Sequence, residues 1–481
     1  MRLFLQVVFC FLCFVFFGLP AWSQLCTGSL GDPIVNQTFG NGSPGPPLSA
    51  ATTSYNYINV DCPNDGMYAL RSTTVNCYNS WHSLVSDHTG DPQGNFMLVN
   101  ASFEPGDFYI DTVRGLCANT GYQFSAWVMN MMRPQQGIRP NITFSIEKTD
   151  GTVLGSFSSG DVPVTTSPQW NNYGLFFKTP SATFDLVVRM RNNAPGGAGN
   201  DIALDDITFR PCGPQISVQI SGRGEKVDFC ETDTASLLLT SEISAGYINS
   251  NYQWQVSTDG GVRWLDIAGA NSLFYVRKRT GAGKYLYRLS VVENENMNIV
   301  SCRITSPFVT INVHAKPIVD AGPDRTILKG ERTLLEGKIT GDSILFAWEP
   351  QVLLENAGSL TPIVTASEST TYILKANSVW GCSNQDSVFV KVIDDIYIPT
   401  AFTPNGDGLN DLWRIPDLDP SIGAEVWVFN RYGEIVYYSK GATVAWDGKL
   451  HGKRQAGNVF VYLVDLKKGK PHRKGIITLI R

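Results

Sequence analysis

Apolar and polar residues alternate along most of the chain, in short runs separated by Gly, Asn, Asp and Pro. A period of two places every second side chain on the same face, as in a half-buried β-strand. No stretch keeps the helical period of 3.6 residues over three turns. The pattern therefore predicts an all-β protein. Expected strands include residues 96–102, 108–113, 122–131, 142–148, 173–178 and 184–191.

Turn-rich clusters at residues 211–214, 315–317 and 394–395 interrupt the strand-like runs and mark expected domain boundaries. Each resulting segment is long enough for a β domain. We therefore expect a signal peptide followed by four β domains, with the boundaries 1–23, 24–213, 214–315, 316–393 and 394–481.

The first 23 residues have the features of a secretory signal peptide. Met1 and Arg2 form a short basic start, residues 3–19 are nearly all apolar, and Ala21 and Ser23 are small residues at the −3 and −1 positions. This predicts cleavage after Ser23, with an uncleaved anchor as the alternative. No later run of about 18 apolar residues occurs. We expect a secreted or outer-surface protein with no membrane-spanning segment in the mature chain.

Composition narrows the class further. Hydrophobic residues make up 43% and aromatic residues 11% of the 481 residues, which excludes a disordered chain. The net charge is −5, with 38 Lys and Arg against 43 Asp and Glu. A strongly basic nucleic-acid-binding protein is therefore excluded, and we expect no nucleic-acid partner.

Eight cysteines remain after signal removal, with no CxxC or Cys/His cluster. In an exported protein, disulfides are the expected state. Cys26 and Cys212 bracket the segment 24–213, and a bridge between them could join its first and last strands. A Cys230–Cys302 bridge is expected to join the terminal strands of the next domain. No partner is predicted for Cys62, Cys77, Cys117 or Cys382.

The end of the first domain carries a resemblance. Residues 201–209 read Asp-Ile-Ala-Leu-Asp-Asp-Ile-Thr-Phe, and Trp127 and a Gly196–Gly197 loop precede them. The segment resembles the end of galactose-binding-like and MAM-type jelly rolls, an architecture shared by many carbohydrate-binding modules. The resemblance implies a ligand-binding jelly roll and a structural calcium ion held by Asp205 and Asp206. A hydrogen-bonded turn at these two residues is the alternative.

The middle of the chain resembles two further β-sandwich types. Trp254 in residues 252–257, with Tyr285 and Tyr287 in residues 283–288, resembles an immunoglobulin-like domain, although Tyr287 stands where antibody domains have their second Cys. Residues 319–325 and 346–350 resemble PKD modules, which usually serve as spacers.

The C-terminal segment carries the most specific motif. Residues 397–411 read Tyr-Ile-Pro-Thr-Ala-Phe-Thr-Pro-Asn-Gly-Asp-Gly-Leu-Asn-Asp. With later blocks at 426–438 and 446–448, they resemble the gliding-motility-associated C-terminal domain, a type B sorting domain of the type IX secretion system in Bacteroidota. The resemblance implies a small β-sandwich, export across the outer membrane, and the type IX machinery as partner. The motif residues are Phe402, Pro404, Asn405, Gly406, Asp407, Gly408, Asn410 and Asp411.

Two features of this segment have alternative readings. Asn405–Gly408 suits a tight turn. The alternative is a calcium-binding loop that starts at Asn405, but Leu409 would then stand at the fifth position of that loop, where the EF-hand consensus has a ligand residue. Residues 449–481 contain nine Lys or Arg and one acid, Asp465. This basic stretch could dock on an acidic translocon or a surface glycan, or form a solvated hairpin.

Catalytic motifs are not recognisable: neither HExxH nor GxSxG occurs. The segment 81–91 instead offers Trp81, His82, Asp87 and His88 as ligand-binding candidates. Trp81 is expected to be an exposed platform that stacks on a sugar ring, with the polar neighbours bonding hydroxyl groups. Other candidate platforms are Trp127, Trp170, Tyr55 and Tyr57.

Together these observations predict a non-enzymatic adhesin or glycan-binding protein, whose partner is a glycan or another cell-surface polymer. Ig-like and PKD-like spacers and the missing motifs favour this interpretation. The alternative is an exported glycan hydrolase that uses Asp87 or Asp91 in the first domain.

Overall fold

The structure is a computed structural model. It describes residues 25–75, 77–181, 185–293, 296–416, 418, 420, 423–441, 443–466 and 471–481. The expected signal peptide lies outside these residues. Within them, regular structure consists of β-strands and two 3₁₀ turns, η1 (Asn296–Asn298) and η2 (Val300–Cys302), so the chain is all-β as predicted. None of the described helices has the length and apolarity needed to cross a membrane.

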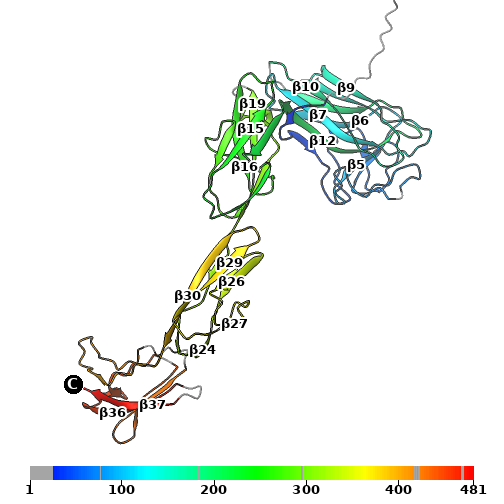
Figure 1. Ribbon diagram of the computed structural model, residues 1–481. Coiled ribbons are helices and arrows are strands. Elements are labelled where there is room, and N and C mark those ends of the chain that lie inside the picture. Colours follow the sequence, from blue (N-terminus) through cyan, green and yellow to red (C-terminus); the bar gives the residue numbers. More distant parts are fainter. Residues whose placement is uncertain are drawn as a thin grey trace, which may run out of the picture. The chain divides into compact units, whose positions relative to one another are not determined.

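The N-terminal sandwich consists of two sheets whose strands are mostly antiparallel (Figure 1). The larger has the order β10-β7-β12-β5-β4-β3, with β1 and β2 also paired to β12, and the smaller has the order β6-β11-β8-β9. The larger sheet comprises β1 (Ser29–Leu30), β2 (Val35–Gln37), β3 (Asn56–Tyr57), β4 (Met67–Arg71), β5 (Phe96–Asn100), β7 (Gly121–Asn130), β10 (Asn171–Lys178) and β12 (Asp201–Gly213). The smaller comprises β6 (Asp107–Val113), β8 (Asn141–Lys148), β9 (Val153–Asp161) and β11 (Leu186–Asn192).

The side chains of β7 point alternately to the two faces of the larger sheet, and residues on both faces are buried. Phe124 and Val128 point into the core between the two sheets, where both are fully buried. Met129 points to the opposite, outer face and is also buried. A second apolar cluster lies there, formed with residues of the long segment 72–95, including Trp81 and Leu84. The outer face of this sheet is therefore covered in part by a connecting segment.

The second sandwich also has two sheets, with the orders β13-β15-β18 and β14-β21-β19-β16-β17, and β20 pairs with β19. Trp254 is fully buried and its indole N–H donates to the carbonyl of Ser272. The strands are β13 (Ile216–Ile220), β14 (Lys226–Cys230), β15 (Leu237–Ile243), β16 (Ser250–Ser257), β17 (Leu265–Asp266), β18 (Phe274–Arg277), β19 (Gly283–Glu293), β20 (Ile304–Thr305) and β21 (Val309–His314).

The third sandwich packs Trp348, Tyr372 and neighbouring aliphatic side chains between short sheets. The sheet orders are β22-β25, β23-β30-β29-β26 and β24-β28-β27. The strands are β22 (Ile318–Asp320), β23 (Arg325–Leu328), β24 (Arg332–Leu334), β25 (Lys338–Thr340), β26 (Ile344–Glu349), β27 (Leu354–Glu355), β28 (Ile363–Thr365), β29 (Thr370–Ser378) and β30 (Ser383–Ile393).

The C-terminal domain is built on one five-stranded sheet with the order β31-β37-β36-β32-β33, plus the pair β34-β35. Its inner face is covered by connecting segments that bring in Trp413 and Trp446, which pair with each other through an isolated bridge. The strands are β31 (Ala401–Phe402), β32 (Glu425–Phe429), β33 (Ile435–Lys440), β34 (Lys449–Leu450), β35 (Lys453–Arg454), β36 (Asn458–Asp465) and β37 (Arg473–Leu479).

The eight cysteines among the described residues are all paired. The bridges are Cys26–Cys212, Cys62–Cys77, Cys117–Cys302 and Cys230–Cys382. The first of these joins the two cysteines that bracket the N-terminal sandwich, and it connects the segment just before β1 to the end of β12, with which β1 pairs.

The expected Cys230–Cys302 bridge is wrong. Cys302 packs beside Val292 at the end of β19, whereas the residue after Cys230 accepts a hydrogen bond from Arg279, just before β19 begins. At about 3.3 Å per residue, the 11 residues of β19 separate these positions by about 30 Å, far beyond disulfide reach. Each cysteine therefore bonds to a partner from another sandwich.

Candidate functional site

A β-bulge in β12 creates the most distinctive polar site of the N-terminal sandwich. Against β7, Asp205 pairs with Trp127 and Thr208 with Ser125, so two residues of β12 stand opposite one of β7. Asp206 takes a left-handed φ of 40° there. Such bulges re-aim side chains and often lie beside functional sites. Two consecutive carboxylates can thus approach the same group, although a regular strand would send them to opposite faces.

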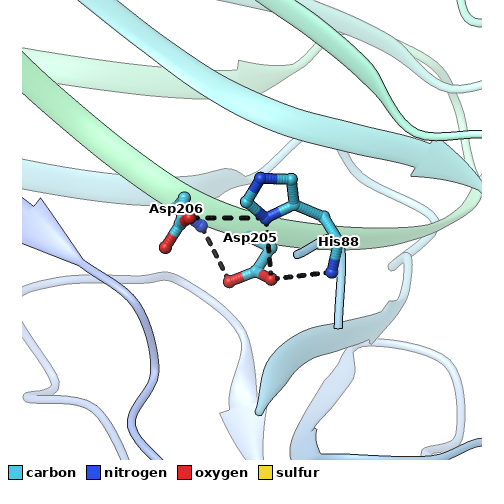
Figure 2. A group of neighbouring side chains, drawn as sticks. All are labelled: His88, Asp205 and Asp206. Atoms are coloured by element: carbon cyan, nitrogen blue, oxygen red, sulfur yellow. Dashed lines mark hydrogen bonds and ion pairs between the residues drawn. The ribbon is translucent and has the colours of Figure 1, made fainter. Parts of the chain in front are cut away.

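That group is the imidazole of His88, which comes from the segment covering the sheet (Figure 2). Its Nδ1 lies 3.3 Å from Oδ2 of Asp205 and 3.3 Å from Oδ2 of Asp206. The backbone N–H of His88 donates to Oδ2 of Asp205 at 3.2 Å. The backbone N–H of Asp206 donates to Oδ1 of Asp205 at 2.8 Å. Each carboxylate is therefore oriented by named partners.

Two tryptophans surround the imidazole. The ring of Trp127 stacks on His88 with centroids 4.6 Å apart, and Trp170 meets the same ring edge-on at 6.2 Å. Both indoles are half-buried. We call His88, Asp205, Asp206, Trp127 and Trp170 the His88 cluster. It combines partly exposed aromatic surface with carboxylate oxygens, a pairing that suits ligands with both apolar faces and hydroxyl groups.

Exposure differs sharply between the two carboxylates. The Asp205 side chain is 1% exposed and that of Asp206 is 26% exposed. Burial raises the pKa of Asp205 to about 6, opposed by the hydrogen bond from the His88 backbone. Burial also raises the pKa of Asp206, and the charge of His88 opposes the shift. Asp206 is therefore the carboxylate that can meet a ligand, and Asp205 positions His88.

Asp87 builds the loop that presents His88. Its Oδ1 accepts hydrogen bonds from the backbone N–H and hydroxyl of Thr89 and from the backbone N–H of Asp91. Its Oδ2 lies where a side chain at position 94 would begin: a Cβ on Gly94 would come within 2.0 Å of it. Glycine at position 94 is therefore needed for this loop. Asp91 likewise accepts from the backbone N–H of Gln93.

The structure contradicts the exposed platform expected at Trp81. This side chain is 2% exposed, and its indole N–H donates to Oδ2 of Asp201 at 2.8 Å. His82 is 3% exposed and lies next to it in sequence. Burial lowers the pKa of His82 and raises the pKa of Asp201 to about 7. Trp81 and His82 thus anchor the covering segment, and of the four predicted residues only His88 belongs to the cluster.

The sequence of β12 contains one signal for the His88 cluster, which is a break in the alternation of inward and outward residues. In residues 201–209, the inward residues are Ile202 and Leu204, and then Ile207 and Phe209. The step from 204 to 207 breaks the period of two. Such a break indicates a bulge. The loop residue that meets it, His88, is distant in sequence and has no comparable signal.

The calcium ion expected at Asp205 and Asp206 fits this geometry poorly. His88, Asp205 and Asp206 could each offer one ligand atom, with all three atoms within 4.8 Å of one another. Calcium takes six to eight oxygen ligands, and a histidine nitrogen is not among them. One imidazole and two carboxylates are closer to the ligand set of a transition metal.

The predicted motif of the C-terminal domain forms a compact loop. Oδ1 of Asp411 accepts from the backbone N–H of Gly406 at 2.6 Å, and Oδ2 accepts from that of Gly408 at 2.8 Å. Oδ1 of Asp407 accepts from the backbone of Leu409. Phe402 is buried in the domain core. The carboxylates therefore satisfy backbone donors, which favours the turn over the calcium loop.

Comparisons with known proteins find family matches for two segments of the chain. Residues 396–479 match the CHU_C type IX secretion signal domain, and residues 221–315 match a domain of unknown function, DUF8696. No curated protein matches the chain significantly.

Similar solved structures are distant. Sidekick-1 immunoglobulin domains 1–5 share 14% identity over 77% of this chain and 78% of that one, with a TM-score of 0.18. Fibronectin(III)-like modules of Clostridium thermocellum CbhA share 14% identity over 36% and 93%, with a TM-score of 0.17. The CBM22-1 xylan-binding domain of Paenibacillus barcinonensis Xyn10C shares 11% over 38% and 97%, with a TM-score of 0.22.

The secretion-signal match has a direct consequence. A type IX secretion signal domain directs export to the cell surface or the medium, so the chain is exported by that system and interacts with its machinery. This agrees with the export route predicted from the motif at residues 402–411.

Proposed function

We propose that the protein is a non-enzymatic adhesin or glycan-binding protein, and that its N-terminal sandwich binds glycan at the His88 cluster. The observation that carries this proposal is the bulge of β12, which holds Asp205 and Asp206 against one imidazole. Backbone distortion of this kind persists where the surrounding structure enforces it, often at binding sites.

Sugar recognition needs two chemical elements that the cluster provides. Trp127 and Trp170 are half-buried, so each indole retains surface that could contact the apolar face of a sugar ring. Asp206 offers carboxylate oxygen to hydroxyl groups, which donate hydrogen bonds to a charged acceptor more strongly than to a neutral one. Asp205 and the stacked Trp127 hold His88 in place, which lowers the ordering cost of binding.

The hydrolase alternative relied on Asp87 or Asp91. The hydrogen bonds to Oδ1 of Asp87 and Asp91 are donated by residues of the loop that carries them. These bonds fix the shape of the loop and already occupy Oδ1 of both side chains. We therefore assign both residues a structural role and place binding, rather than hydrolysis, at this surface.

A glycan array probed with the mature chain from residue 24 tests the proposal. The complete chain is needed because Cys117 and Cys230 pair with cysteines outside their own sandwiches. We expect the protein to bind a defined set of glycans on the array, and the Asp206→Asn variant to lose this binding. Asp185→Asn is the matched control, because Asp185 is an exposed carboxylate in the same sandwich that pairs with exposed Arg114.

A hydrolysis screen on the retained glycans separates the two functions. We expect no product from the wild-type chain. Product formation that disappears in Asp205→Asn would contradict a non-enzymatic role, because a buried carboxyl group with a pKa near 6 can serve as an acid or base. If the protein binds none of the glycans on the array, the proposal that its ligand is a glycan is contradicted.

A further inference from the structure

The Nδ1 atom of His88 faces two carboxylates at once (Figure 2). It lies 3.3 Å from Oδ2 of Asp205 and 3.3 Å from Oδ2 of Asp206. An imidazole nitrogen carries at most one proton, so it can donate a well-directed hydrogen bond to only one of two such oxygens. A charge-assisted N–H···O hydrogen bond measures about 2.7–2.9 Å, and both separations are longer than that. A proton on Nδ1 therefore accounts for only part of this arrangement.

The same separations suit a metal ion bound between the three side chains. Zinc binds histidine nitrogen and carboxylate oxygen at about 2.0–2.2 Å, so neighbouring ligand atoms of a tetrahedral site lie about 3.3–3.6 Å apart. The two distances from Nδ1 of His88 match this spacing. One donor atom from each of His88, Asp205 and Asp206 can be chosen so that all three lie within 4.8 Å of one another. Within the part of the chain that the structure describes, no other group of three His, Cys, Asp or Glu side chains meets this condition.

The balance of charge at the site also favours a bound cation. The side chains of Asp205 and Asp206 are 1% and 26% exposed, and both lie against the same atom of His88. Carboxylates brought this close repel each other, and burial removes the water that would screen them. One imidazolium group can supply a single positive charge, whereas a divalent ion supplies two. Buried charges in proteins are generally paired or coordinate a metal.

The three side chains are held in place by their surroundings. The backbone N–H of Asp206 donates to Oδ1 of Asp205 at 2.8 Å, and the backbone N–H of His88 donates to Oδ2 of Asp205 at 3.2 Å. The ring of Trp127 stacks on one face of the imidazole, which leaves the edge with Nδ1 turned toward the carboxylates. Contacts of this kind orient metal ligands and strengthen metal binding.

The donor atoms indicate the class of ion. Calcium takes six to eight oxygen ligands, whereas one of the three donors here is a nitrogen. Imidazole nitrogen suits transition metals, and zinc accepts carboxylate oxygen beside it. Three protein ligands leave the fourth position of a tetrahedral zinc site open to water or a ligand oxygen. Asp206 is the most exposed of the three side chains and marks the side from which that position is reached.

We propose that His88, Asp205 and Asp206 bind one divalent transition-metal ion, and that zinc matches their donor atoms best. This inference goes beyond glycan binding, because the ion needs only these three side chains and no glycan. It replaces the calcium ion that the resemblance to jelly-roll modules implies for Asp205 and Asp206.

Calorimetric titration of zinc chloride into the untagged mature chain from residue 24, freed of metal beforehand, tests the proposal. We expect one zinc ion per chain. His88→Gln and Asp206→Asn should each lower the affinity by about a hundredfold or more, because loss of a ligand should cost at least as much as loss of an outer contact. The controls Asp185→Asn and His472→Gln alter an exposed carboxylate and an exposed imidazole elsewhere, and should bind zinc like the wild type.

Thermal melts separate the loss of a ligand from the loss of the fold. Zinc should raise the melting temperature of the wild type, because an ion that binds only the folded chain stabilises it. The same addition should leave the melting temperature of Asp206→Asn unchanged. If His88→Gln does not fold, Asp206→Asn decides the question, because the Asp206 side chain is partly exposed and its replacement should be tolerated.

Three outcomes would overturn the proposal. The first is a wild-type chain that binds no zinc, and the second is equal zinc affinity in the wild type, His88→Gln and Asp206→Asn. The third is binding of calcium chloride that Asp206→Asn abolishes and His88→Gln leaves intact, which would assign the carboxylates to calcium. The titration contains no glycan, so failure to bind zinc and failure to bind glycan on the array are distinguishable.

Discussion

The eight-stranded sheet of the N-terminal sandwich and the five-stranded sheet of the C-terminal domain both bury one face in a core, and they differ in what covers the other. In the first, the segment 72–95 lies on the outer face, and Trp81, Leu84 and Met129 pack there. In the second, Val461 and Ile476 on the outer face remain about half exposed.

This difference shows that a strand's sequence does not determine what its outer face contacts. Both strands place apolar side chains on the outer face, Trp127 and Met129 in β7 and Val461 and Leu463 in β36, although β7 also places Gln123 and Ser125 there. A distant segment with its own anchor, Trp81 on Asp201, covers the first. A covered face can hold a polar cluster such as that of His88 at its margin, whereas an uncovered apolar face offers area for a partner.

The largest expected effect comes from removing the C-terminal domain. Deletion of residues 394–481 should abolish export and leave the protein in the periplasm, because the matched secretion signal lies at 396–479. Cell fractionation with an antibody against the N-terminal sandwich measures this. Appearance of the truncated protein at the cell surface in normal amounts would contradict it.

Truncation of one side chain on each outer face sharpens the comparison. Trp81→Ala should cost about 3–5 kcal/mol of unfolding free energy, because it removes a buried indole and a hydrogen bond to a buried carboxyl group. Val461→Ala should cost less than about 1 kcal/mol, because that side chain is half exposed. Denaturant unfolding of the two variants measures both. Equal costs would remove the distinction between a covered and an uncovered face.

Reduction of the disulfides separates the two regions in another way. Cys26–Cys212, Cys62–Cys77 and Cys117–Cys302 constrain the N-terminal sandwich, and no cysteine occurs after residue 382. Each lost bridge should cost about 2–4 kcal/mol. Dithiothreitol should therefore lower the melting transition of the N-terminal sandwich and leave that of the C-terminal domain unchanged. Non-reducing peptide mapping that finds Cys117 as a free thiol would contradict this account.

The pH dependence of stability should have opposite signs in the two regions. Burial raises the pKa of Asp201 from its ordinary value near 4 to about 7. Between about pH 4 and 7, Asp201 is therefore protonated in the folded N-terminal sandwich and ionised in the unfolded chain. The unfolding free energy of this sandwich should fall as the pH rises through this range, and Asp201→Asn should flatten the dependence. Thermal melts from pH 5 to 8 measure the slope.

In the C-terminal domain, hydrogen bonds from Leu409 and Asn405 lower the pKa of Asp407, which is fully exposed. Stability linked to this group is present at neutral pH and is lost only as the pH falls through the acid range. A rise in stability of the N-terminal sandwich between pH 5 and 8 would contradict the assignment of Asp201.

The sequence predicts local features of this fold well and non-local ones poorly. The expected strand at 122–131 corresponds to β7 at 121–130, and that at 142–148 to β8 at 141–148, because alternation is a local property. Trp81 looked exposed beside polar neighbours, yet its partner Asp201 is 120 residues away. Bridges between sandwiches, such as Cys230–Cys382, depend on which domain ends meet, and spacing does not show that.

The candidate site follows the same division. The resemblance to jelly-roll binding modules pointed to the carboxylates at 205 and 206, as calcium ligands, and the broken period at 204–207 explains their geometry. That His88 approaches them, stacked on Trp127, requires the path of the covering segment. A loop of this length has no periodic pattern from which its path could be inferred.

Calorimetric titration of a glycan identified on the array into the mature chain tests the central claim most directly, with Asp206→Asn and Trp170→Ala as variants. The account predicts that each variant weakens binding by about 1–3 kcal/mol, roughly 5- to 150-fold, while Asp206→Asn keeps the wild-type melting temperature. Wild-type affinity in both variants would show that the glycan binds elsewhere and would contradict the assignment of the His88 cluster.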